Sequence, residues 1–148
     1  MFDRLLKSLL APAPEPLADT DARLALTALL VRIARSDNDY DRAEIETIER
    51  VVAQRYGLDT AGVAALMAEA EALEAEAPDT VRFTRAIKEA VAHDDRLAVV
   101  ESAWAVVLAD GDRADEEDAL MRMVVSLLGI SDLDSNIARR KVAGVGDR

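Results

Sequence analysis

The sequence predicts an all-α protein with about seven helices, arranged as two pseudo-twofold related helix-turn-helix units around two central apolar helices. Composition is the first reason: 51% of the 148 residues are hydrophobic but only 3% are aromatic, and glycine and proline are scarce. Alanine-rich, glycine-poor sequence favours helix over sheet. The second reason is that apolar residues recur every three or four positions, the spacing of one helix face. The third is an internal repeat.

The repeat relates residues 21–52 to residues 94–125 at a shift of 73 positions. Nine of the 32 aligned pairs are identical: Asp21/Asp94, Arg23/Arg96, Leu24/Leu97, Ala25/Ala98, Asp37/Asp110, Asp39/Asp112, Glu44/Glu117, Val51/Val124 and Val52/Val125. Each copy contains a very apolar helix, an acidic turn and an amphipathic helix. Neither copy alone could bury its apolar helix, so we expect one domain in which the two central helices pack together.

The N-terminal arm, residues 1–16, combines an amphipathic helix at Phe2–Leu10 with a proline-rich linker at Ala11–Pro16. Such an arm is typical of a membrane-surface or partner-docking anchor. The alternative is a helix that packs on its own domain or is partly disordered, as chain termini often are. We expect the helical domain to span residues 17–143, followed by a frayed tail at residues 144–148.

The first unit begins with a helix over about Asp21–Ser36, capped by Asp19 or Thr20. Apolar residues surround this helix almost completely, which predicts an enclosed central position. After the turn Asp37–Asp41, Asp41 and Glu44 have the spacing of a capping box that opens the second helix. Gly57 ends that helix, as a left-handed C-terminal residue does.

Two further helices complete the first half, at about Ala61–Glu76 and Asp79–Ala92. No basic residue occurs between Gly57 and Val81, whereas acids recur there. This acidic run predicts a solvated helix face, with a docking face for a basic partner as the alternative. In the fourth helix we expect Val81, Phe83, Ile87 and Val91 to be buried.

The second unit repeats the first. A fifth helix runs to about Ala109, an acidic turn follows at Asp110–Ala114, and Asp115 caps a sixth helix that ends at Gly129. Ser131 and Asp134 form another capping box, which opens a last helix over about Asp132–Val142. Trp104 and Met121–Met123 lie at core spacing, so we expect them to be buried.

The charge balance excludes some functions. The formal net charge is −11, and so acidic a surface repels phosphate backbones, which argues against nucleic-acid binding. The chain has no cysteine, hence no disulfide, thiolate metal site or cysteine nucleophile. No apolar span is long enough for a membrane helix, and no signal peptide is evident.

The two acidic turns are the candidate metal sites. Each places several carboxylates in a small volume, and hard divalent cations such as Ca²⁺ prefer such oxygen ligands. Neither turn is an EF-hand, because position six of the first loop is Arg42 instead of glycine and position twelve is Ile48 instead of glutamate. The alternative is that the acids only cap helices and satisfy amides in the turns.

Enzyme activity is not indicated. His93 is the single histidine and lies at a helix junction, where a cap or a surface residue is the more ordinary interpretation. The sequence contains no phosphate-binding glycine loop and no His-Glu-x-x-His motif. The turn carboxylates have no second type of catalytic residue nearby. We therefore expect a non-enzymatic protein.

Residues 29–44 (LLVRIARSDNDYDRAE) and 104–117 (WAVVLADGDRADEE), with the Leu-Leu-Gly-Ile sequence at Leu127–Ile130, resemble the TerB family of tellurite-resistance proteins. The TerB-like domain of DjlA co-chaperones is similar. The resemblance covers about Asp21–Val142 and implies an all-helical fold. It also implies a cytoplasmic stress-response protein, peripheral to the inner membrane through a membrane-associated protein partner, and not itself transmembrane.

The resemblance further implies an acidic face that holds divalent cations, with Ca²⁺ as one candidate. The positions that match are Asp37, Asp39, Glu44, Asp110, Asp112 and Glu117. Asn38 replaces the usual glycine of the first turn, and the second turn has Ala114 where an acid or hydroxyl would help. Two functions follow: a small acidic scaffold or sensor that binds a divalent cation at its turns, or a metal-free interaction module.

Overall fold

The computed structural model describes residues 19–36, 40–76, 80–109 and 115–144 of the chain. Within these ranges it is all-helical, as predicted. Its helices, in chain order, are α2 (Asp19–Arg35), α3 (Arg42–Tyr56), α4 (Thr60–Glu76), α5 (Thr80–Ala90), α6 (His93–Val107), α7 (Asp115–Leu127) and α8 (Asp132–Ala143). Each lies within a few residues of a helix that the sequence predicts. The N-terminal arm and the C-terminal tail lie outside the described residues.

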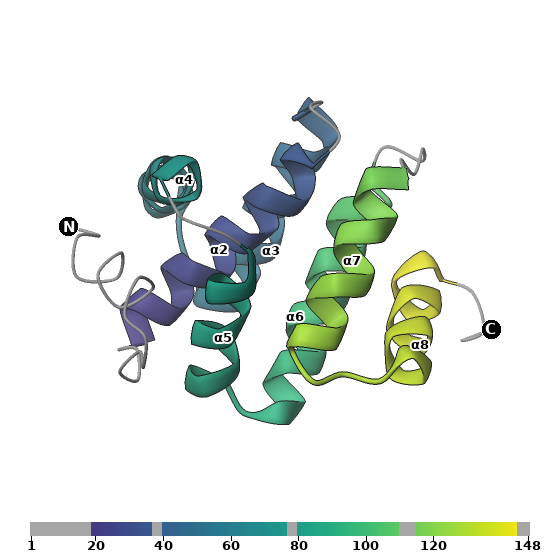
Figure 1. Cartoon of the computed structure of the whole chain (residues 1–148). Coiled ribbons are helices and arrows are strands. Elements are labelled where there is room, and N and C mark those ends of the chain that lie inside the picture. Colours follow the sequence, from purple (N-terminus) through teal and green to yellow (C-terminus); the bar gives the residue numbers. More distant parts are fainter. Residues whose placement is uncertain (1–18, 37–39, 77–79, 110–114, 145–148) are drawn as a thin grey trace.

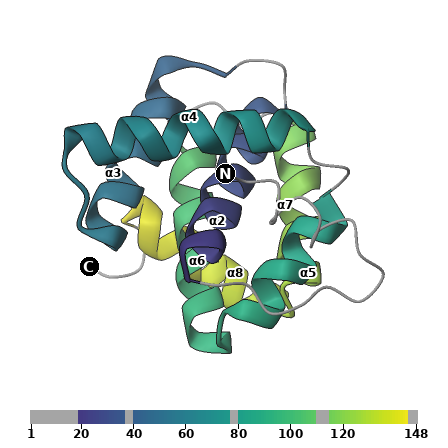
Figure 2. The same cartoon turned by 90° about the vertical axis from the view of Figure 1, so that its left-hand side faces the viewer.

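Helix α2 is enclosed, which confirms the prediction from its apolar surroundings. Every residue from Leu24 to Ala34 is buried except Arg32. Figure 2 shows α4 lying across α2, and α5 and α6 pack against it as well. A helix that is apolar on all sides is stable in water only when other elements cover each side. The core of the molecule therefore forms around α2 and its counterpart α6.

The pattern of helix contacts is reciprocal, as a pseudo-twofold arrangement requires. The central helices α2 and α6 touch each other. Each central helix also contacts the second helix of the opposite unit: α2 contacts α7, and α6 contacts α3. Within each unit the third helix packs on the central one, α4 on α2 and α8 on α6 (Figure 1). The two units therefore share one core, which supports a single domain.

The repeat extends to the third helix of each unit, at a spacing of 72 residues. Gly57 after α3 and Gly129 after α7 both have positive φ, 63° and 74°. Beyond them, Leu58 N–H donates to Ala53 and Ile130 N–H donates to Val125, both at 3.1 Å. These are equivalent bonds that end the second helix of each unit. Equivalent residues are 73 positions apart at the acidic turns but 72 positions apart from these glycines onward, because the second unit has one residue fewer between its acidic turn and its glycine.

Equivalent N-caps follow these glycines. Asp59 Oδ1 accepts from Gly62 N–H at 2.8 Å to open α4, and Ser131 Oγ accepts from Asp134 N–H at 3.0 Å to open α8. The predicted roles of Gly57 and Ser131 are confirmed. Each acceptor satisfies a backbone donor that the first helical turn leaves without a partner in the helix.

The identical pair Arg23/Arg96 lies beside the C-terminal end of the second helix in both units. Arg96 Nη1 donates to the Leu128 carbonyl at 2.9 Å, at the C-terminal end of α7. Arg23 lies 4.6 Å from the ring centroid of Tyr56, the last residue of α3. The Nε atoms of both arginines are buried. A cation at a helix C-terminus meets its partial negative charge, so each arginine stabilises the second helix of its unit.

Two predicted core residues are in fact exposed. Val81 on α5 is 43% exposed and Met123 on α7 is 40% exposed. Both stand at apolar spacing, but among the described residues their side chains remain exposed. Ile87, Trp104 and Met121 are buried as predicted, and the side chain of Phe83 lies outside the described residues. No helix in the described part of the chain is long and apolar enough to cross a bilayer.

Candidate functional site

The two acidic turns occupy equivalent places, between α2 and α3 and between α6 and α7. Four of the six predicted cation ligands, Asp37, Asp39, Asp110 and Asp112, lie outside the described residues. Glu117 is the third residue of α7, and its side chain is also outside the described part. Glu44, the third residue of α3, is the one predicted ligand whose environment is defined.

Glu44 is completely buried, at 0% exposure, in the first turn of α3. Its backbone N–H donates to Asp41 Oδ1 at 2.9 Å, so Asp41 is the N-cap of the helix, as predicted. Glutamate is rarely buried, because removing a carboxylate from water is costly unless a cation or hydrogen bonds compensate. The turn thus combines an ordinary capping residue with a carboxylate held in the interior.

Tyr40 anchors the end of the same turn to α4. Its hydroxyl donates to Glu71 Oε2 at 2.7 Å, and the guanidinium of Arg35 lies 4.8 Å from the ring centroid. Burial, followed by the hydrogen bond to Glu71, raises the pKa of Tyr40 far above its ordinary value. The phenol therefore stays protonated and keeps its donor role at any physiological pH.

A pair of arginines at the end of α2 adds a second connection to α4. Arg32 Nε and Arg35 Nη1 contact the two carboxylate oxygens of Glu74 at 3.2 and 2.9 Å. Arg32 also donates to the Glu74 backbone carbonyl at 3.1 Å. The predicted solvated acidic face of this helix is therefore wrong for Glu71 and Glu74, which bind groups of the protein itself. The acids of α4 thus bind residues on both sides of the connection between α2 and α3.

The described residues contain no group of three or more acidic, histidine or cysteine side chains placed to hold a metal ion. The predicted ligand sets depend on residues of the two turns that are outside the described ranges. His93 is exposed at the first position of α6, which agrees with its interpretation as a surface residue.

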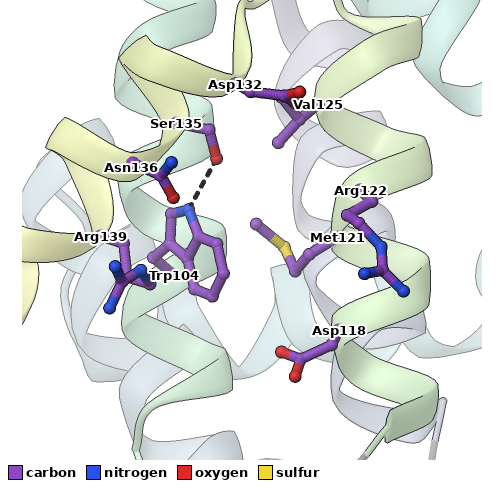
Figure 3. A pocket seen from close by; sticks show the side chains of 9 residues that line it. All are labelled: Trp104, Asp118, Met121, Arg122, Val125, Asp132, Ser135, Asn136 and Arg139. Atoms are coloured by element: carbon purple, nitrogen blue, oxygen red, sulfur yellow. Dashed lines mark hydrogen bonds between the residues drawn. The ribbon is translucent and has the colours of Figure 1, made fainter.

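One site was missed by sequence reasoning: a pocket of about 430 Å³ between α7 and α8, called here the α7–α8 pocket (Figure 3). Its floor is apolar and contains Trp104, Met121 and Val125. Trp104 Nε1 donates to Ser135 Oγ at 3.1 Å, and Arg139 lies 6.0 Å from the indole. Trp104 and Met121 stand at core spacing, so their sequence pattern indicates burial and carries no sign of a pocket.

The family model described as tellurite resistance protein TerB matches residues 23–140. No curated protein and no solved structure matches the chain. The matched range begins within α2 and ends within α8, so it includes both units and both acidic turns.

Proposed function

The chain belongs to the TerB family of tellurite resistance proteins, and on this basis we propose that it is a non-enzymatic stress-response protein of the tellurite-resistance type. It acts as a small acidic scaffold or sensor, and its two turns bind a divalent cation such as Ca²⁺. We place it in the cytoplasm, peripheral to the inner membrane through a membrane-associated protein partner. The net charge of −11 suits a basic partner and disfavours nucleic acid.

The observation that carries the cation proposal is the burial of Glu44 at an acidic turn that occurs twice. A carboxylate inside the protein is a strong oxygen ligand, and Asp37 and Asp39 precede it in the same connection. The matching residues Asp110, Asp112 and Glu117 stand at the equivalent connection of the second unit. Asp41 is occupied as the N-cap, so the set consists of Asp37, Asp39 and Glu44 without it.

A bound cation would lower the mutual repulsion of the clustered acids and thereby stabilise the two turns. Because each turn joins a central helix to the second helix of its unit, cation binding would affect the packing of these helices in the shared core. A sensor needs such a connection between its ligand and the packing of its helices.

Calorimetric titration with Ca²⁺, Mg²⁺ and Zn²⁺ tests the proposal. We expect saturable binding of at least one cation, and loss of one site each in Asp37→Asn/Glu44→Gln and Asp110→Asn/Glu117→Gln. The charge-matched control is Glu76→Gln/Asp95→Asn, which removes two exposed carboxylates elsewhere and should leave binding unchanged. No saturable binding to the wild-type protein, or equal losses in the control, would remove the cation from the proposal.

A metal-free interaction module is the second candidate, favoured by one observation. Asp41 acts as an ordinary helix cap, so one acid at the first turn has a structural task. In this case the N-terminal arm carries the contact. Deleting residues 2–16 should then abolish partner capture, while the turn double mutants retain it.

A further inference from the structure

The outer face of α8 carries two large aliphatic side chains that no other described residue covers. Leu133 is 69% exposed and Ile137 is 56% exposed, the highest values among the large hydrophobic residues of the described part. They stand four positions apart on one helix, so they are neighbours on its surface. Exposed apolar residues scattered singly are ordinary, whereas adjacent ones join into a patch that leaves water only when another molecule covers it. We call Leu133 and Ile137 the α8 patch.

The patch lies on the side of α8 that is turned away from the rest of the molecule. Helix α8 packs against α6 and α7, and its residues Ser135 and Ala138 are buried there. With 3.6 residues per turn, Leu133 and Ile137 project to the opposite side of the helix. Figure 1 shows α8 at the edge of the molecule, beside α6 and α7. A second molecule can therefore approach this face directly.

The fold itself does not require large side chains at these positions. At the spacing of 72 residues, Leu133 and Ile137 correspond to Ala61 and Ala65 on the outer face of α4, and both alanines are exposed. The same face of the third helix thus holds small side chains in the first unit and large aliphatic ones in the second. The α8 patch is therefore a property of its residues, added to a face that the shared fold leaves open in both units.

Charges of opposite sign accompany the patch along the helix. Asp134 lies in the first turn of α8 and Lys141 in its last turn. Seven residues separate them, which is close to two full turns, so both lie on one line beside Leu133 and Ile137. The side chain of Lys141 is 62% exposed, and its contact with Glu101 at 3.1 Å is a surface pair that contributes little to stability. The face therefore runs from an acid to a base past an apolar centre.

We propose that α8 is the interface of a homodimer, in which the α8 helices of two copies pack antiparallel about a twofold axis. In a twofold interface the same surface of both copies meets, so each patch covers the other. The line of Asp134 and Lys141 then lies beside the same line of the second copy, running in the opposite direction. Asp134 of each copy thereby faces Lys141 of the other. A second copy of this chain is the occupant because the face is complementary to itself in both shape of charge and apolar centre.

The interface is small, which determines the strength of the dimer. One pair of short helices buries less than the ~1,200 Å² at which stable interfaces begin, so we expect a transient dimer. Its dissociation constant should be on the order of 100 µM. The net charge of −11 on each copy opposes association. At an ionic strength of about 0.15 M the Debye length is only ~8 Å, so distant charges are screened while pairs in contact still attract.

Sedimentation equilibrium of the full chain tests the proposal, from about 5 µM to about 1 mM, a range that brackets the expected dissociation constant. EDTA in the buffer keeps the test separate from cation binding at the turns. Leu133→Ala/Ile137→Ala introduces the residues of Ala61 and Ala65, which the fold already tolerates at the same face. We expect this variant to weaken dimerisation at least about tenfold, because each truncated side chain occurs twice in a twofold interface.

The antiparallel arrangement is tested by two charge reversals. Asp134→Lys places two lysines opposite each other at both ends of the homodimer, and Lys141→Glu places two acids there. Each variant alone should dimerise at least about tenfold more weakly than the wild type, since like charges in contact repel. In an equal mixture every contact again joins opposite charges, and we expect association close to that of the wild type. A parallel pair would gain nothing from Asp134→Lys and Lys141→Glu across this line, because position 134 would then face position 134.

A control separates this interface from general apolar stickiness. Adding Ala61→Leu/Ala65→Ile to the alanine double variant moves the two aliphatic side chains to the exposed face of α4, where Gly62 and Glu69 replace the acid and the base. This variant should remain as weakly associated as the alanine double variant. Recovery of wild-type association would overturn the proposal, because apolar area alone would then explain it.

Three other results would overturn the proposal. They are a wild-type protein that stays monomeric up to about 1 mM, beyond which association is very weak, a dissociation constant that does not change in Leu133→Ala/Ile137→Ala, and a mixture of the charge variants that associates no better than either alone. Circular dichroism confirms that each variant is folded. The alanine double variant decides the outcome if a charge variant is not, since alanine is the best helix former.

Discussion

At the scale of single residues, the acidic turn of the first unit is defined by the contrast between Asp41 and Glu44. Asp41 caps α3 from the surface, whereas Glu44 is fully buried one turn later. Their spacing alone predicts a capping box, and the cap formed by Asp41 could be anticipated from it. The complete burial of Glu44 could not, because it depends on which helices cover the first turn of α3.

Tyr40 gives a pH-dependent prediction. Its pKa is raised in the folded protein, first by burial and then by the bond to Glu71, whereas an unfolded tyrosine titrates near pH 10. The protonated phenol of Tyr40 therefore stabilises the folded state in full at any pH below about 10, and this contribution to the free energy of unfolding is lost progressively as the pH rises above that value. Burial also raises the pKa of Tyr56, which acts in the same direction.

We expect Tyr40→Phe to cost about 1–2 kcal/mol at pH 8, through loss of the hydrogen bond to Glu71. The difference between wild type and variant should shrink between pH 10 and pH 11, because the wild type alone loses the contribution of Tyr40. Urea denaturation at several pH values measures both free energies. A difference that stays constant up to pH 11 would contradict the assignment.

At the scale of helices, α4 is tied to the end of α2 by charge as well as by apolar packing. Glu74 is 13% exposed and binds both Arg32 and Arg35, which lie just before the first acidic turn. Removing one partner of an ion pair that is mostly shielded from water leaves a charge without compensation, and this costs more than breaking an ion pair on the surface. Helix α4 thus holds the C-terminal end of α2 as well as covering the core.

Glu74→Gln should lower the free energy of unfolding by about 1–3 kcal/mol, since it weakens both charged contacts in a partly dry environment. The matched control is Glu46→Gln, which weakens the ion pair with Arg42. The side chain of Arg42 is 84% exposed and that of Glu46 is 59% exposed. That control should change stability by no more than about 0.5 kcal/mol. If both variants lost the same free energy of unfolding in thermal or chemical denaturation, the contacts of Glu74 would contribute no more than a surface ion pair does.

Helix positions were largely predictable from the sequence, because their ends are local features. Gly57, Asp59 and Ser131 act where their chemistry places them. Exposure on the outer helices was less predictable. Val81 and Met123 continue an apolar stripe, yet whether the stripe is covered depends on the neighbouring helix, which no local pattern specifies. The α7–α8 pocket escaped prediction for the same reason, since it arises between helices.

At the scale of the whole molecule, the two units share one core. Helices α2 and α6 touch each other, and each also contacts the second helix of the opposite unit. This arrangement followed from the repeat together with the need to bury two helices that are apolar on all sides. A shared core implies that neither unit unfolds alone.

Unfolding should therefore be a single transition. Trp104 fluorescence reports on the second unit, while far-ultraviolet circular dichroism reports on all helices, and we expect the same midpoint from both. Leu30→Ala, at a fully buried position of α2 in the first unit, should cost about 2–5 kcal/mol and shift both midpoints equally. Val81→Ala, at an exposed position, is the control. Separate midpoints would show that the units are independent.

The reciprocal contacts between α2 and α7 and between α6 and α3 have a bearing on how such a molecule arises. A fragment that ended after α4 would present the uncovered flank of α2 to solvent, shaped to receive a helix like itself. Two such fragments would be expected to associate symmetrically, each supplying what the other lacks. The present chain then corresponds to two such fragments joined in one polypeptide, whose halves have equivalent folds but differ in detail, since only the second has Trp104 in the floor of a pocket.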